Sequence, residues 1–136
     1  MKKIYILLLT TLIIFSCSSS EDSNSKNNSL NPPAWIQGTW AQKYGSNGSY
    51  TYQPTFIFTK NDFCTISLNS SSCISESLNN TPDLKINESR TNSEYKFSLK
   101  TNGVTTSYRF IKVSDSKIEY DIYPDQNVPN MELFKQ

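Results

Sequence analysis

The residues able to do chemistry are few in this chain, which has three cysteines, Cys17, Cys64 and Cys73, and no histidine. Histidine is the commonest general base and a common metal ligand. Without it, neither Cys64 nor Cys73 has the usual partner that would activate a thiol nucleophile. We therefore expect no enzyme, no metal site and no cofactor, and we expect the cysteines to serve structure or attachment.

The charged residues give no strong field. They make up 18% of the chain, with a formal net charge of +1 and only two arginines, Arg90 and Arg109. Arginine is the preferred reader of phosphates and base edges, so no nucleic-acid partner is expected. The carboxylates occur singly. The loosest grouping matches no calcium-loop spacing and is typical of a solvated strand face; it comprises Asp115, Glu119, Asp121 and Asp125.

The N-terminal segment has the features of a secretory signal. Lys2 and Lys3 precede an apolar run, Ile4–Phe15, that is too short to span a bilayer, which needs about 20 apolar residues. The run ends at Ile14-Phe15-Ser16-Cys17, which resembles a bacterial lipobox. That resemblance implies a signal peptide over 1–16 and a mature chain that begins at an acylated Cys17, with thioether-linked diacylglycerol and an added fatty acid such as palmitate. The alternative is a plain signal peptide with an incidental cysteine.

A polar tether follows Cys17. Residues 17–32 are rich in Ser and Asn, carry almost no apolar side chains before Pro32-Pro33, and are expected to be disordered. The acidic pair in Ser18–Asp22 resembles the surface-export signal of Bacteroidota lipoproteins. The resemblance implies an outer-membrane lipoprotein on the cell surface, held by its lipid. A periplasm-facing location is the alternative.

The remaining domain, 33–136, shows strand periodicity. Tyr95, Phe97 and Leu99 alternate with polar residues, as antiparallel strands with one wet face do. Asn102-Gly103 is a strong tight-turn signal between two such runs. Strands are predicted near 39–45, 52–59, 63–68, 93–100, 104–113, 117–123 and 130–135, with 83–87 as a possible eighth. Within the unclear stretch 69–92, Ser75–Leu78 favours a brief helix or a lid. The predicted fold is all-β: an antiparallel up-and-down meander of seven or eight strands closing into a small barrel.

One motif carries a family resemblance. Trp35-Ile36-Gln37-Gly38-Thr39-Trp40 is similar to the G-x-W signature on the first strand of lipocalins. The resemblance implies a lipocalin-like (calycin-type) barrel in which Trp35, Gly38 and Trp40 form the barrel floor. In lipocalins a late Arg covers the tryptophan, whereas here the last-strand position holds Lys135. A small apolar ligand in the barrel mouth is implied by analogy, and an interior filled by Phe and Tyr is the alternative.

The two remaining cysteines favour a disulfide. With Cys17 lipidated, Cys64 and Cys73 are left in a compartment where free thiols tend to pair, and a hairpin near Asn69-Ser70 would place them opposite each other. The alternative is a core Cys64 and a loose Cys73.

Two functions remain open from the sequence. The first is a lipid-anchored, non-catalytic binding or interaction domain, with a small apolar ligand or an envelope protein as partner. The second is a structural or accessory envelope lipoprotein whose packed barrel binds no small molecule.

Overall fold

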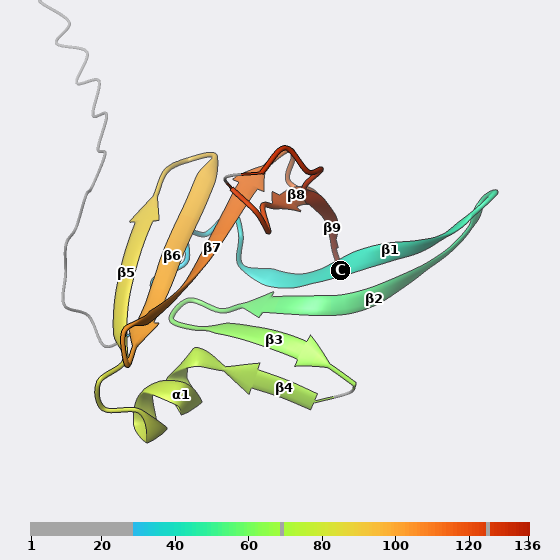
Figure 1. The fold of residues 1–136 in the computed structure, drawn as a ribbon. Helices are drawn as coiled ribbons and strands as arrows, with labels where there is room; N and C mark the ends of the chain where they lie inside the picture. The colour runs from blue at the N-terminus through green and yellow to red at the C-terminus, as the bar shows by residue number, and fades with distance from the viewer. Residues whose placement is uncertain (1–28, 69, 125) are drawn as a thin grey trace, which may run out of the picture.

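A computed structural model describes residues 29–68, 70–124 and 126–136 and shows one antiparallel sheet of nine strands in the order β4-β3-β2-β1-β9-β8-β7-β6-β5 (Figure 1). These residues contain one short helix, α1 (Ile74–Asn80). No helix in the described part of the chain is long and apolar enough to cross a membrane. The strands are β1 (Gly38–Ser46), β2 (Ser49–Phe58), β3 (Phe63–Ser67), β4 (Ser70–Cys73), β5 (Lys85–Arg90), β6 (Glu94–Thr101), β7 (Val104–Lys112), β8 (Lys117–Tyr120) and β9 (Met131–Lys135).

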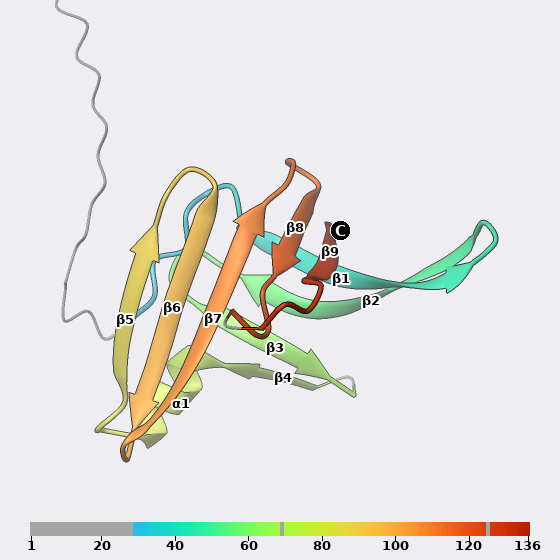
Figure 2. The ribbon, with the colours of Figure 1, turned by 45° about the horizontal axis from the view of Figure 1, so that its top comes forward.

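The order of the strands divides the sheet into two meanders. Strands β1 to β4 pair in sequence order, and so do β5 to β9, while β9 pairs with β1 and joins the two halves. The halves face each other across the core, since Phe58 and Phe63 of the first contact Tyr95 and Phe97 of the second. Figure 2 shows the strands of the two halves crossing steeply.

The predicted closure into a barrel is not found. Among the described strands, no ladder joins β4 to β5, so the sheet stays open there. The physical reason lies in α1, which follows β4 directly and places Ile74 and Leu78 against the core. The chain therefore covers this side of the core with a helix rather than with a strand pair.

Most strand predictions are confirmed, with two corrections. The predicted strand 83–87 exists as β5, and the predicted brief helix within 69–92 is α1. Strand β4 was not predicted, which raises the number of strands to nine. The strand predicted over 117–123 ends at Tyr120; Asp121 still donates its backbone N–H to the carbonyl oxygen of Arg109 at 2.9 Å, but Ile122 and Tyr123 beyond it are exposed.

The core is unusually rich in aromatic rings. The alternating inward positions of both meanders are buried, and Trp40, Tyr95 and Phe110 have no exposed surface. Burying such large side chains contributes about 25 cal/mol per Å² of apolar surface. The remaining buried rings are Phe56, Phe58, Phe63 and Phe97.

The β1–β2 hairpin extends beyond the rest of the sheet as a projecting arm (Figures 1 and 2). Its turn, Asn47-Gly48, has positive φ angles of 54° and 84°, the left-handed conformation that tight hairpin turns require. Asn102-Gly103, the turn predicted from the sequence, has the same property, with φ angles of 48° and 80°.

Candidate functional site

The two tryptophans that were predicted to form a barrel floor both pack against the core of the domain. Trp40 is fully buried, and its indole Nε1 donates to the carbonyl oxygen of Ile36 at 2.6 Å. Trp35 is half-buried and donates from Nε1 to the carbonyl oxygen of Thr91 at 3.0 Å. In both indoles the nitrogen donates to a backbone carbonyl and the ring packs against the core, so both tryptophans have a structural role.

Lys135 covers this floor from the last strand. Its ammonium lies 5.5 Å from the centre of the Trp40 ring, within the range of a cation–π contact. Gly38 makes room for it: φ is +126°, and a Cβ atom there would lie 2.9 Å from Cε of Lys135. The sequence singled out each of these residues, and the structure brings all of them together.

The aromatic rings of the interior lie in close contact with one another. Phe97 stacks on Tyr108 with ring centres 4.7 Å apart, and Phe58 and Phe63 lie 4.9 Å apart. Phe110 meets Phe58 edge-to-face at 5.0 Å. Half-buried Tyr108 lines the same face, and burial raises the pKa of its hydroxyl. These contacts favour a filled interior over one that encloses a ligand.

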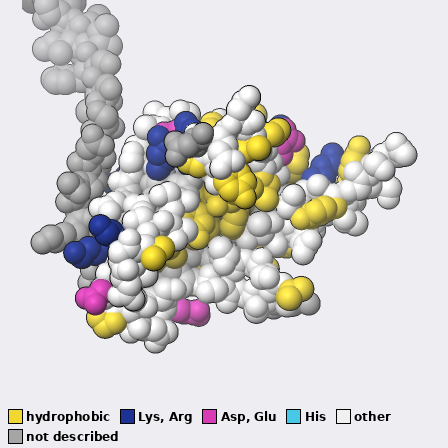
Figure 3. All heavy atoms as spheres, in the orientation of Figure 1, with side chains coloured by type: hydrophobic (Ala, Val, Ile, Leu, Met, Phe, Trp, Pro, Cys, Tyr) yellow, Lys and Arg dark blue, Asp and Glu magenta, His cyan; other side chains and the backbone are white. Residues whose placement is uncertain are grey.

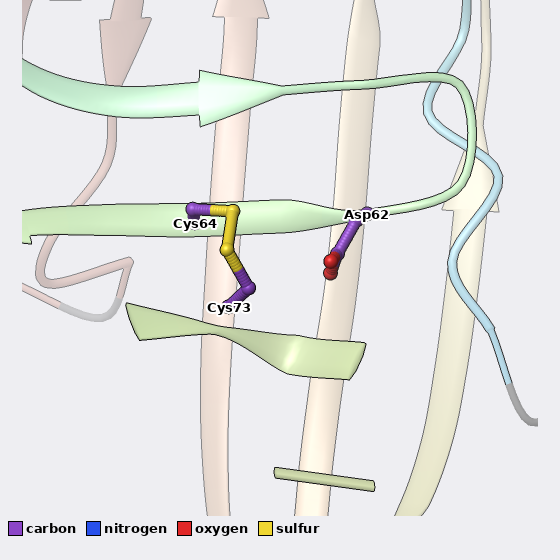
Figure 4. Close-up of side chains that lie close together, drawn as sticks. All are labelled: Asp62, Cys64 and Cys73. Atoms are coloured by element: carbon purple, nitrogen blue, oxygen red, sulfur yellow. A yellow bond between two sulfur atoms is a disulfide. The ribbon is translucent and has the colours of Figure 1, made fainter. Parts of the chain in front are cut away.

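The predicted disulfide between Cys64 and Cys73 is confirmed (Figure 4). The two residues are directly opposite each other in the β3–β4 ladder, with Cα atoms 4.0 Å apart. Asp62 lies beside them and holds α1, because its carboxylate accepts bonds from the backbone N–H of Ser75 at 3.1 Å and from the Ser75 hydroxyl. The disulfide and Asp62 together fix the β4–α1 corner.

The same three residues, Asp62, Cys64 and Cys73, are the grouping closest to a metal site in the described ranges, with their potential ligand atoms within 4.8 Å of one another. Metal ligation by cysteine requires a thiolate. Here the two sulfur atoms are bonded to each other, and the Asp62 carboxylate also accepts the N–H of Phe63 at 2.8 Å. In this oxidised form the cluster is therefore a structural staple.

The predicted solvated acidic face is only partly correct. Asp115 is exposed and pairs with Lys112, and Glu119 accepts a hydrogen bond from Asn130. Asp121, however, is 8% exposed. Its carboxylate is held by a guanidinium, which replaces the lost hydration. Asp125, the fourth predicted member, lies outside the described residues.

That guanidinium belongs to Arg109, at the centre of a charge network on the outer face of β6 and β7. Arg109 donates from Nε to Glu94 at 2.8 Å and from a terminal nitrogen to Asp121 at 2.9 Å. Lys96 lies 2.7 Å from Glu94. Partial burial alone would raise the pKa of Glu94, but the hydrogen bonds from Lys96 and Arg109 outweigh it and hold that pKa below its ordinary value. The bonds that Arg109 donates, to Glu94 first and then to Asp121, raise the pKa of its guanidinium.

A surface pocket of about 360 Å³ lies beside this network, within the size range of small-molecule sites. Its walls include Ser98 and Ser107, which are opposite each other on β6 and β7, and Pro124 from the segment after β8. No local sequence pattern indicates this pocket, since only strand register brings its residues together. Its charged lining residues are Lys96, Arg109 and Asp121, and Glu94, which pairs with both cations, lies in the adjoining network.

The chain matches no known family model, no curated protein and no solved structure. The predicted lipidation site Cys17, the signal segment 1–16 and the tether up to residue 28 lie outside the described residues.

Proposed function

We propose that this chain is a lipid-anchored outer-membrane lipoprotein, exposed on the cell surface, whose non-catalytic, lipocalin-like β domain is a binding or interaction module. Its partners are the membrane, through the N-terminal lipid at Cys17, and an envelope protein or small apolar ligand. The proposal for localisation rests on the lipobox-like sequence and the acidic tether. The proposal for the domain rests on its own geometry.

The observation that carries the lipocalin-like assignment is the meeting of the first and last strands. Trp40 of β1 pairs with Lys135 of β9, and the Lys135 ammonium covers the Trp40 ring. This is the arrangement that the G-x-W resemblance implies, with Lys in place of Arg. The two meanders would form a calycin-type barrel if β4 and β5 were joined, and α1 stands where that pairing is missing.

The first described residues of the domain are fixed to β5, at the point where an N-terminal tether would join it. The backbone N–H of Asn31 donates to Glu88 at 3.0 Å, and Arg90 donates back to the carbonyl oxygen of Asn31 at 3.1 Å. Leu30 is buried against the core. A lipid tether would therefore join the domain close to Asn31, which is hydrogen-bonded to two side chains of β5.

The close packing of the interior favours the second candidate, which is a structural or accessory envelope lipoprotein without a small-molecule ligand. Ring contacts near 5 Å leave the centre of the domain occupied by its own side chains. Both candidates share the lipid anchor, and they differ in whether a ligand occupies the domain.

Lipidation is tested by labelling cells with an alkyne analogue of palmitate. The wild-type chain should be labelled and should fractionate with the outer membrane, while Cys17→Ala should lose both properties. The variant Cys64→Ala/Cys73→Ala is the matched control, because it removes two cysteines without touching Cys17. Equal labelling of wild type and Cys17→Ala would contradict the anchor, and full protection from protease on intact cells would contradict surface exposure.

The ligand question is tested on the secreted Cys17→Ala chain by native mass spectrometry. A co-purifying small molecule would favour the first candidate. A mass accounted for by the polypeptide alone, as one copy or a whole number of copies, would favour the second.

A further inference from the structure

The arm has sheet neighbours on neither side over most of its length. Strand β9 pairs with β1 only from Trp40 to Gln42, and β3 pairs with β2 only from Phe56 to Phe58. Residues 43–46 and 49–54 are all exposed. An isolated two-stranded hairpin is marginally stable in water. Contact with a partner would therefore stabilise the arm more than the rest of the described domain.

The composition of the arm is that of a protein-binding loop. Residues 44–52 read YGSNGSYTY and contain only Tyr, Gly, Ser, Asn and Thr. Binding loops use tyrosine for large, rigid contact area and the small polar residues for adaptable hydrogen bonds. The segment 38–59 contains one charged residue, Lys43, and no acidic residue. It therefore lacks the run of charges that usually protects an exposed hairpin from association.

Strand register places two of the three tyrosines of the arm on one surface, which we call the arm face, while Tyr44 lies on the opposite surface. Lys43 is opposite Tyr52 and Gly45 is opposite Tyr50, so Tyr50, Tyr52 and Lys43 share it. It continues onto β9 through Phe134, whose ring centre lies 5.9 Å from that of Tyr52. Tyr50 and Tyr52 are 47% and 46% exposed. Figure 3 shows hydrophobic and basic side chains together on the projecting arm.

The arm face carries complementary charges. The Lys43 ammonium lies 3.6 Å from the centre of the Tyr50 ring, and no carboxylate of the described residues is within ion-pair distance of it. On β9, Glu132 lies two residues before Phe134 and so on the same side of the sheet; it pairs with Lys117, and its side chain remains 54% exposed. One surface thus offers a lysine without a carboxylate and an accessible carboxylate, both beside the Phe134 ring.

A surface that carries both members of an ion pair is suited to a second copy of itself. In a two-fold dimer the same patch is used twice, so each contact from one copy to its partner is repeated in reverse. We propose that the arm face is a homodimer interface, in which Lys43 of each copy pairs with the partner's Glu132 around a centre of Tyr50, Tyr52 and Phe134. This names the partner for the interaction module proposed above and rests on that role, but not on the lipid anchor.

The test is the mass of the secreted Cys17→Ala chain by sedimentation equilibrium across a concentration series. The expected result is a mass twice that of the chain. Lys43→Glu should weaken the dimer at least about tenfold in Kd, the loss of one hot-spot contact, and Glu132→Lys should do the same. The double variant Lys43→Glu/Glu132→Lys should recover the dimer, because the two charges are exchanged.

Two controls separate this result from loss of folding or of the anchor. Tyr123→Ser changes a tyrosine that is 52% exposed but lies outside the arm face, and should leave the dimer intact. Tyr52→Ser should yield a monomer that keeps the near-ultraviolet spectrum of the folded domain. A wild-type chain that is monomeric throughout would overturn the proposal, as would a dimer unaffected by Lys43→Glu and Tyr52→Ser. Neither outcome alters the lipidation test, so the two proposals fail separately.

Discussion

The disulfide at the β4 edge gives the most quantitative prediction. Cys64 and Cys73 are nine residues apart in the sequence. In the chain-entropy description, a cross-link that closes a loop of this length stabilises the fold by about 2.6 kcal/mol, because it restricts the unfolded chain. With an m-value of about 1.5 kcal/mol per molar urea, breaking the bond should lower the midpoint of unfolding by about 1.7 M.

The assay is urea unfolding followed by tryptophan fluorescence, since Trp40 is fully buried when the domain is folded. The oxidised chain, the chain reduced with a phosphine, and the variant Cys64→Ala/Cys73→Ala are compared. The reduced chain should show the full shift. The variant should show a similar shift, plus a small loss of packing because Cys64 is 6% exposed.

Reductant added to the variant is the control, and it should have no effect. A shift below about 0.5 kcal/mol on reduction of the wild type would refute the loop-entropy reasoning. Such a result would mean one of two things. Either the loop between Cys64 and Cys73 is already restricted in the unfolded chain, or β3 and β4 are separated there in the folded one.

Three further predictions concern the core and the charged groups. Phe110→Ala, at a fully buried ring, should reduce the free energy of unfolding by about 3–5 kcal/mol in urea titrations, with Phe110→Leu in between; an effect below 1 kcal/mol would contradict the packed interior. Glu94 has a lowered pKa in the folded chain, so the stability it contributes is present above its ordinary pKa of 4.5 and is lost as the pH falls. The difference in unfolding free energy between wild type and Glu94→Gln should therefore shrink from pH 6 to pH 3. A constant difference would refute this. Burial first, and then Glu88, raise the pKa of Tyr95, so the stability of the fold should decrease as the pH rises above the ordinary value of 10.0. Tyr95→Phe should reduce that decrease, which is measured from unfolding curves at pH 9 and pH 11.

The strands that the sequence predicted are those with a local signal. Tyr95, Phe97 and Leu99 alternate with polar residues because β6 has one face in the core, and a period of two is visible without knowing the neighbours. The Asn102-Gly103 turn is equally local, since it depends on two residues able to adopt positive φ. The Cys64–Cys73 pair was predictable because few thiols were available.

Strand β4 and the open edge had no such signal. Ser70–Cys73 contains no apolar alternation, and its place is given by the register Cys64↔Cys73 on β3. Closure of a barrel depends on whether two distant edges meet, and α1 prevents it here. The strand that was predicted to reach 123 shows the reverse error: its alternation continues to Ile122, but β8 ends at Tyr120 and Ile122 is exposed.

The charge network was also beyond the sequence. Glu94 and Asp121 lie 15 and 12 residues from Arg109 along the chain, and only the pairing of β6, β7 and β8 brings them to one place. Arg109 was noted for its rarity in the chain rather than for its neighbours.

The position of β9 has a consequence for how the domain is assembled. It is synthesised after every other described strand, yet it lies in the middle of the sheet, where it pairs with β1 on one side and β8 on the other. Each meander can form from local contacts, whereas the β1–β9 ladder must close the longest loop in the domain, which makes such pairings slow. Until that ladder forms, the chain is two half-sheets with their aromatic faces uncovered. The nascent domain is thus most prone to aggregate just before its synthesis is complete, when a chaperone would have the most apolar surface to hold.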